Sequence, residues 1–115
     1  MPNLNSPTSV TAKLARVELT TSPQSVLTAP SGTVCRVVSV IAANIDGTNN
    51  ADLTLRTSDG VTTADIIKTV VVPADASLVA ISRDNILYLP AGTSLSAFAS
   101  ANGDITLHVS YEEIA

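Results

Sequence analysis

Aromatic residues are scarce in this chain of 115 residues: they make up 3% of it, and Trp is absent. A base-stacking platform needs exposed aromatic side chains, and a sugar-binding face usually needs aromatic rings as well, so the sequence indicates neither. The hydrophobic fraction of 45% is normal for a globular protein, and the core must be built from Val, Ile, Leu and Ala. Such small and β-branched side chains suit closely packed β-sheets.

Charge is sparse too, since charged residues are 14% of the chain against about 25% in typical soluble domains. The net charge is −4, and the six basic residues are spread singly along the sequence. Nucleic-acid binding needs a basic stripe that neutralises phosphates, and binding to an anionic membrane surface needs a basic cluster. We therefore expect no nucleic-acid partner and no membrane partner.

Cys35 is the only cysteine, which excludes an internal disulfide and a thiolate metal cluster. It lies in the apolar run Val34–Val38, where we expect a small buried hydrophobic residue rather than a reactive thiol.

The segment Met1–Thr8 has neither a basic stretch nor an apolar core, so we expect no signal peptide. No apolar run approaches the roughly 18 residues of a membrane span.

What the sequence does contain is a rhythm of short β-branched runs separated by turn residues. We predict strands over Lys13–Thr20, Ser25–Ala29, Thr33–Ala43, Ala51–Thr57, Ile66–Val72, Ser77–Ile81, Asn85–Leu89, Ser94–Ser100 and Ile105–Ile114. Short strands at this spacing are typical of all-β proteins. The sequence therefore predicts a single antiparallel β-sandwich, jelly-roll-like, with about eight or nine strands and under about 10% helix.

Alternation along these runs predicts which side chains face the core. Four apolar residues that alternate with polar neighbours are expected to be buried: Leu53, Leu55, Leu107 and Val109. The run Thr33–Ala43 is apolar on both faces, which predicts a central strand that is covered on each side. Asp-Gly and Asn-Gly pairs mark turns at 46–47, 59–60 and 102–103, and Ser58–Gly60 should form a hairpin.

The chain divides into an extended N-terminal arm, residues 1–12, and a β-sandwich domain, residues 13–115. The arm holds two prolines and two asparagines around few apolar residues, so it cannot build a core of its own. We expect it to contribute to assembly on a neighbouring subunit and not to the folding of the sandwich. The candidate subunit-contact residues are Leu4, Val10, Leu14 and Arg16.

No motif indicates a chemistry. The segment Asp46–Asp52 has the oxygen ligands of a loose calcium loop, but its glycine comes second and no Glu follows nearby, so we interpret it as a polar hairpin loop. Nothing brings Asp59, Asp65 and Asp75 together as an acid–base pair, and we expect His108 to point into solvent. Neither a Gly-x-Ser-x-Gly motif nor a Gly-rich phosphate loop occurs. We expect no enzyme activity and no catalytic, cofactor-binding or metal-binding residue.

Ser and Thr make up about a quarter of the chain, which favours flat, weakly charged strand faces. Exposed sheet edges normally carry charged residues such as Lys as guards, and this chain has few. We therefore expect other subunits to cover much of the surface. A soluble domain that is merely rich in hydroxyl groups is the alternative.

Two segments, Leu89-Pro-Ala-Gly-Thr-Ser-Leu95 and Val109-Ser-Tyr-Glu-Glu113, carry a family resemblance. Together with runs such as Arg36–Asn44 and Lys68–Ala74, they make residues 26–114 similar to small β-sandwich virion proteins of tailed bacteriophages. Members of this family are capsid decoration (cement) proteins or neck and tail components, and they have no catalytic residues to transfer. The N-terminal arm lies outside the resemblance.

The resemblance implies a non-enzymatic structural protein of a phage virion, made in the host cytoplasm, with head decoration favoured. A neck, tail or fibre component, or a receptor- or glycan-binding module, is the alternative. The implied partners are the major capsid protein or other virion proteins. We also expect a homo-oligomer, with a trimer favoured, and no cofactor.

Overall fold

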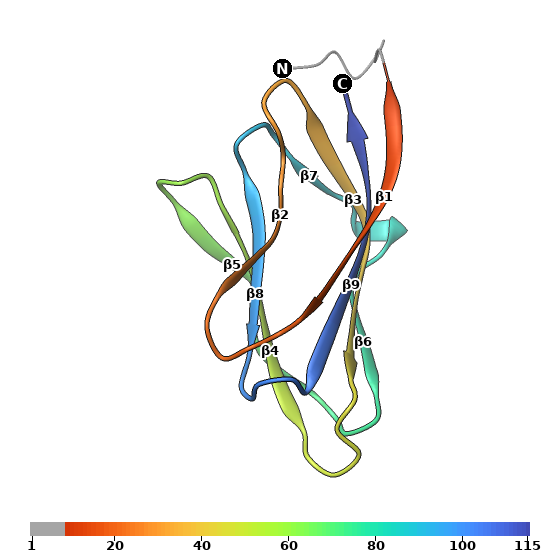
Figure 1. Cartoon of the computed structure of the whole chain (residues 1–115), viewed down its shortest axis with the longest axis vertical. Coiled ribbons are helices and arrows are strands. Elements are labelled where there is room, and N and C mark those ends of the chain that lie inside the picture. The colour runs from red at the N-terminus through yellow and green to blue at the C-terminus, as the bar shows by residue number, and fades with distance from the viewer. Residues whose placement is uncertain (1–8) are drawn as a thin grey trace.

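The computed structural model describes residues 9–115, which form two antiparallel β-sheets packed as a sandwich (Figure 1). The elements are β1 (Val10–Glu18), β2 (Gln24–Thr28), β3 (Val34–Asn44), β4 (Ala51–Ser58), β5 (Thr63–Val72), β6 (Ser77–Ile81), the 3-10 turn η1 (Arg83–Asn85), β7 (Leu87–Leu89), β8 (Ser94–Ala99) and β9 (Ile105–Ile114). The expected all-β sandwich is confirmed. No helix in the described part of the chain is long and apolar enough to cross a membrane.

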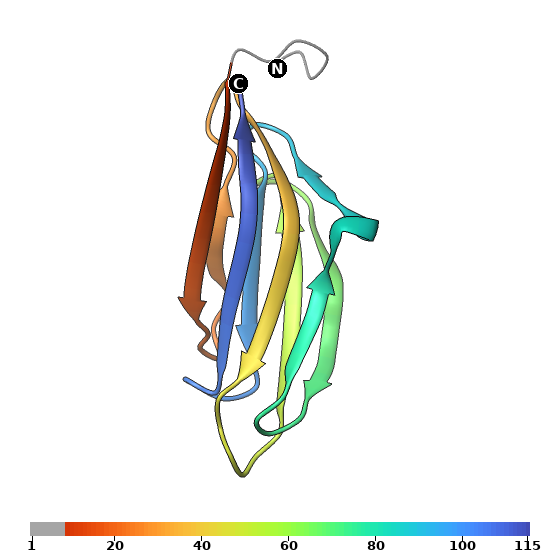
Figure 2. The same cartoon turned by 90° about the vertical axis from the view of Figure 1, so that its right-hand side faces the viewer.

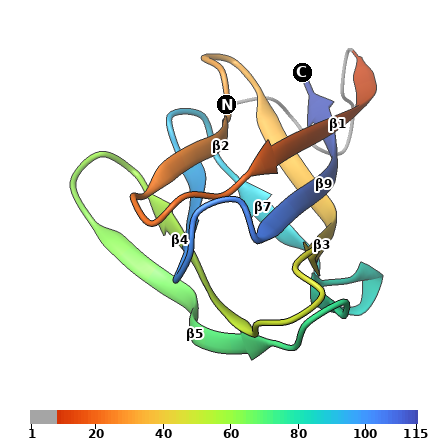
Figure 3. The ribbon, with the colours of Figure 1, turned by 60° about the horizontal axis from the view of Figure 1, so that its bottom comes forward.

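The strand order is that of a jelly roll. The first sheet has the order β1-β9-β3-β6, with β7 also paired to β3, and the second has the order β2-β8-β4-β5. The chain passes from one sheet to the other at most connections and stays in one sheet only from β4 to β5 and from β6 to β7. A five-stranded layer, in which β6 and β7 both pair with β3, and a four-stranded layer linked in this way form a jelly roll, as the sequence predicts. Figure 3 shows the two layers from nearer their lower end.

The core lies between the two sheets, and its buried side chains are those of Leu, Val, Ile and Ala together with one cysteine. The four residues expected there, Leu53, Leu55, Leu107 and Val109, are fully buried. Cys35 is fully buried as well, and burial raises the pKa of its thiol. Side chains from both sheets join one continuous cluster, so the period-2 alternation of the sequence predicted the inward register correctly.

The N-terminal strand starts earlier than the sequence indicates. β1 begins at Val10 and not at Lys13, and its register with β9 is regular throughout. Ser9 exchanges two backbone hydrogen bonds with Ala115, of 3.1 and 2.9 Å. The last three residues of the expected arm therefore belong to the first sheet, because backbone pairing with β9 extends the strand past its amphipathic part. Leu4 lies outside the described residues.

The turns follow the expected residues but only partly the expected connections. Asp59-Gly60 joins β4 to β5 as a hairpin, with Gly60 at φ +92°, a backbone conformation that glycine adopts without strain. The loop at Asp46–Asn50 instead joins β3 to β4 in the opposite sheet, so its interpretation as a hairpin loop is wrong. A turn signal indicates that the chain reverses, not which sheet receives the next strand.

The segment Asn85–Leu89, expected to be a strand throughout, begins with the end of a 3-10 turn. The amide of Asn85 donates to the carbonyl of Ser82 at 3.0 Å, and the strand β7 starts only at Leu87. Figure 2 views the molecule from the first sheet and shows η1 projecting beside that sheet. This projection gives the otherwise flat face a raised border on one side.

Candidate interaction surface

The outer face of the first sheet is the side that points away from the second sheet. The register of β1 with β9 places the even-numbered residues of both strands there, from Val10 and Ile114 to Glu18 and Thr106. Several exposed large apolar side chains lie on this face or beside it on the η1 side: Val10, Leu14, Ile41, Val79, Ile86 and Tyr88. Isolated exposed apolar side chains are ordinary, but a group of them on one face indicates an interaction site.

β3 gives this face its apolar centre. The expected central position is confirmed, since β3 lies between β9 and the pair β6 and β7. The expectation that both of its sides are covered is wrong for the single chain, because Ile41 on the outer side is 37% exposed. β3 therefore carries more apolar side chains than the single chain buries.

A β-bulge in β3 places an extra side chain on the outer side. The register with β9 shifts between Val37 and Ser39. Val37 and Val40 are both fully buried, so two residues lie between these inward positions where a regular strand has one. A bulge of this kind redirects side chains locally, and Val38 reaches a groove on the outer face.

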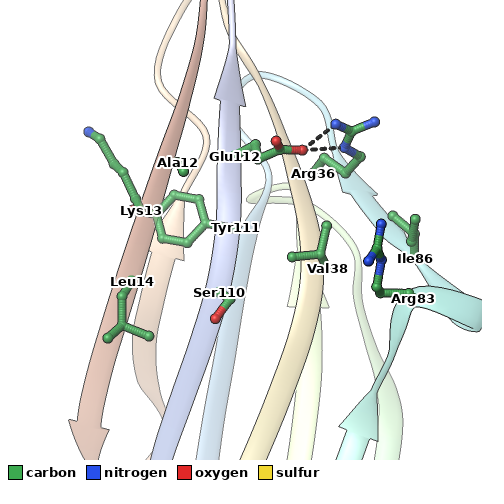
Figure 4. A pocket seen from close by; sticks show the side chains of 10 residues that line it. All are labelled: Ala12, Lys13, Leu14, Arg36, Val38, Arg83, Ile86, Ser110, Tyr111 and Glu112. Carbon is green, nitrogen blue, oxygen red and sulfur yellow. Dashed lines mark hydrogen bonds and ion pairs between the residues drawn. The ribbon is translucent and has the colours of Figure 1, made fainter.

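This groove has a volume of about 660 Å³ and lies between β1 and η1 (Figure 4). Ala12, Val38 and Ser110 line it from β1, β3 and β9. Leu14 lies on the β1 side and Ile86 on the η1 side. The groove therefore combines small side chains in its middle with larger apolar side chains at its borders.

Three of the six basic residues line this groove, from elements that are distant in the sequence: Lys13, Arg36 and Arg83. Arg36 donates to Glu112 Oε1 from Nε, at 2.6 Å, and also from Nη2. This hydrogen-bonded carboxylate raises the pKa of Arg36. Lys13 Nζ lies 3.0 Å from Glu113 Oε1, and this hydrogen bond raises the pKa of Lys13. Two of the three cations are thus compensated within the chain.

The outer face as a whole is electrically neutral. Its cations, counted with η1, are Arg16, Arg36 and Arg83, and its anions are Glu18, Asp84 and Glu112. Lys13 and Glu113 pair beside it. All of the net charge of −4 lies elsewhere, on six Asp residues and two cations: Asp46, Asp52, Asp59, Asp65, Asp75, Asp104, Arg56 and Lys68.

The structure brings together the described members of the expected contact set. Val10, Leu14 and Arg16 all lie on the outer face along β1, and all are exposed. Leu14 lines the groove, with Val10 and Arg16 on either side of it along the strand. Sequence analysis missed the groove residues of other elements: Val38, Arg83, Ile86 and Ser110. Only the two-sided apolar pattern of the β3 segment pointed toward them.

Two of the carboxylates considered for metal binding or catalysis, Asp46 and Asp59, are engaged by amides of their own loops. Asp46 Oδ1 accepts hydrogen bonds from the amides of Thr48 and Asn49, and these bonds lower the pKa of Asp46. Asp59 accepts from the amides of Thr62 and Val61 with the same effect on its pKa. No group of three His, Cys, Asp or Glu side chains within residues 9–115 is arranged to hold a metal ion.

No protein-family model matches the sequence, and no curated protein matches it. Among solved structures, the chain is similar to a pentameric capsid protein isolated from metagenomic phage sequences, in two crystal structures. One has 16% identity and a TM-score of 0.42 over 88% of this chain and 59% of that chain. The other has 16% identity and a TM-score of 0.44 over 85% and 60%. The chain spans about three-fifths of the length of those proteins, and similarity this low supports no conclusion about function.

Proposed function

We propose that this chain is a non-enzymatic structural protein of a bacteriophage virion, and specifically a capsid decoration (cement) protein that binds the surface of the head. The observation that carries the proposal is the resemblance of residues 26–114 to small β-sandwich virion proteins. One of its two characteristic segments, Val109–Glu113, lies in the second half of β9 and contributes Ser110, Tyr111 and Glu112 to the groove. The resemblance therefore includes residues of the candidate interaction surface.

The architecture suits a protein that binds a partner and catalyses no reaction. Nearly the whole described chain is strand or short turn, so few residues remain for a mobile active-site loop. Burial of apolar surface contributes about 25 cal/mol per Å², and a modest contact repeated over a lattice gains from the number of copies. A stable sandwich with one open apolar face fits this role.

The proposed partners are the major capsid protein or other virion proteins, together with further copies of this chain, for which a trimer is the favoured order. The proposed location is the virion. A neck, tail or fibre component is the nearest alternative, since it uses the same kind of framework. A glycan-binding module is less well supported, because the aromatic ring that lines the groove, Tyr111, is half-buried and packs against the core.

A copy-number measurement on purified heads and on whole virions of the encoding phage tests this proposal. Quantitative mass spectrometry, with labelled antibodies in electron microscopy, counts and locates the chain. Many copies spread over the head are expected of a decoration protein. A handful of copies at one vertex would assign the chain to the neck or tail, and absence from both heads and virions would contradict the virion role.

A further inference from the structure

We propose that the outer face of the first sheet is the surface through which one copy of this chain binds another copy. The inference rests on the proposed function in that an oligomer is part of it, and it names the surface that forms the oligomer. The groove between β1 and η1 lies within the proposed contact.

The first argument is the amount of apolar surface left open. Leu14 on β1 and Val79 on β6 lie near opposite edges of the face and are 58% and 59% exposed, with Ile41 between them. β3 is apolar on both sides, and its inner side is buried, whereas on its outer side Val38 and Ala43 are partly exposed and Ile41 is exposed. A strand that is buried on both sides is typical of a sheet with a layer on each face. A second copy would supply the missing layer.

The second argument is electrostatic and concerns the surfaces through which two identical chains can meet. Two copies that each carry −4 repel wherever their charged surfaces meet. The outer face of the first sheet is neutral, and its ion pair between Arg36 and Glu112 is already satisfied. The whole net charge of −4 lies on four loop residues, Asp46, Asp59, Asp75 and Asp104, because Asp52 and Asp65 on the second sheet are offset by Arg56 and Lys68. Identical chains therefore meet through this sheet face with less like-charge repulsion than through the loops.

The third argument is size. β3 has 11 residues and β9 has 10, which at about 3.3 Å per residue gives a face about 35 Å long. Four strands about 4.8 Å apart give a width of about 20 Å, hence roughly 700 Å² in flat projection. A stable interface buries about 800 Å² on each partner. The estimated flat area of this face is therefore close to what a stable interface needs.

The exposed edge of the second sheet is a weaker candidate. Its outermost strand, β5, also exposes Ile66 and Val71, but its register with β4 shifts twice and Thr69 has φ +49°. Bulges of this kind twist an edge away from pairing with another chain. Val71 therefore supplies a matched control: a valine on a strand, 52% exposed, that lies outside the proposed contact.

Analytical ultracentrifugation of the full chain over a range of concentrations tests the inference. The wild-type chain is expected to sediment as an oligomer, and the mass gives its order. Val79→Glu and Leu14→Glu are each expected to raise the dissociation constant at least tenfold, because they bury a carboxylate in the contact. Val71→Glu should leave it unchanged. Circular dichroism and melting curves confirm that each variant is folded.

A measurement on the wild-type chain covers the case in which a variant does not fold. Methyl NMR spectra recorded at high and low concentration should show shifts at Val38, Ile41 and Val79, while Val71 stays constant. A chain that is monomeric at every concentration overturns the inference. So does dissociation by Val71→Glu but not by Val79→Glu, or an oligomer that depends on residues 1–8 and not on Val79.

These outcomes are separate from those that test the virion role. A monomeric chain that still coats heads would overturn the inference and leave the proposed function standing. An oligomer that forms through this face but is missing from heads and virions would support the inference and contradict the proposed function. The ultracentrifugation can therefore contradict the inference without contradicting the proposed function, and the copy-number measurement can do the reverse.

Discussion

The strands of both sheets alternate inward and outward side chains, but the outward side chains of the two sheets differ in how far the chain itself covers them. On the second sheet, the outward Arg56 has its Nε 3.0 Å from Asp65 Oδ1, and its guanidinium carbon lies 4.9 Å from the centre of the Phe98 ring. The contact with Asp65 lacks hydrogen-bond geometry and acts as an ion pair. On the first sheet, Leu14 and Val79 are open to solvent.

A residue next to the ion pair between Arg56 and Asp65 is also covered by the chain itself. Thr54 points outward from β4 and is nonetheless buried. Its hydroxyl oxygen accepts a hydrogen bond of 3.2 Å from the amide of Thr69, the residue that bulges β5. Around Thr54 and Arg56 the second sheet thus covers its outward groups within one chain, although its edge strand β5 exposes Ile66, Val70 and Val71. The first sheet leaves apolar side chains exposed across its whole width, from Leu14 on β1 to Val79 on β6, and this difference supports the proposal that its outer face is the interaction surface.

The largest effect should come from the core that both sheets share. Leu107→Ala removes a fully buried side chain from β9 and should lower the free energy of unfolding by about 2–5 kcal/mol. Leu14→Ala, on the neighbouring β1 but on the outer face, should cost less than about 0.5 kcal/mol in the monomer. Urea unfolding at concentrations below self-association measures both. Equal costs would show that the inward and outward registers were assigned wrongly.

A smaller effect should separate the two outer faces. Arg56→Met keeps the aliphatic stem but removes both the ion pair with Asp65 and the contact with Phe98. A partly exposed ion pair contributes about 0.2–1 kcal/mol and a cation–π contact about 0.5–1 kcal/mol, so a loss of about 1 kcal/mol is expected.

Arg83→Met is the matched control on the first face, since Arg83 forms no ion pair with any residue in the described range 9–115. Its effect on the free energy of unfolding should be close to zero. The Arg56 effect should also shrink at high salt, because screening weakens a partly exposed pair. If the two arginine variants lost equal stability, the contrast between a closed and an open face would be lost.

Much of the fold was accessible from the sequence because it depends on local patterns. Alternation predicted the inward side chains of β4 and β9, such as Leu53 and Leu107, since a one-residue slip would expose them all. The interaction surface depends on features without a local signal. The bulge at Val38 inserts one residue into β3, and η1 replaces the start of an expected strand. The placement of Lys13, Arg36 and Arg83 around one groove depends on the order of strands in the sheet, which the turn residues do not specify.

The smallest expected effect on stability concerns the N-terminal segment. It shows how much of this segment contributes to the first sheet at the β1 edge. Removing residues 1–8 takes away no described strand residue, and the melting temperature of the isolated chain should stay nearly unchanged. Removing residues 1–12 also deletes Val10–Ala12 and their pairing with Ile114, Glu113 and Glu112. At about 0.5–1.5 kcal/mol for each lost hydrogen bond, this longer deletion should cost about 1–3 kcal/mol.

Under the proposed function, the shorter deletion should instead lower the occupancy of the chain on heads, because an extended segment that orders on a neighbour contributes through many copies. Melting curves and head-binding assays on the same two variants separate folding from assembly. A large fall in melting temperature for the 1–8 deletion would mean that this segment helps to cover the first sheet in its own chain. Normal head binding by a stable 1–8 deletion would place attachment on the sandwich itself, on a surface other than the face proposed for contact between copies.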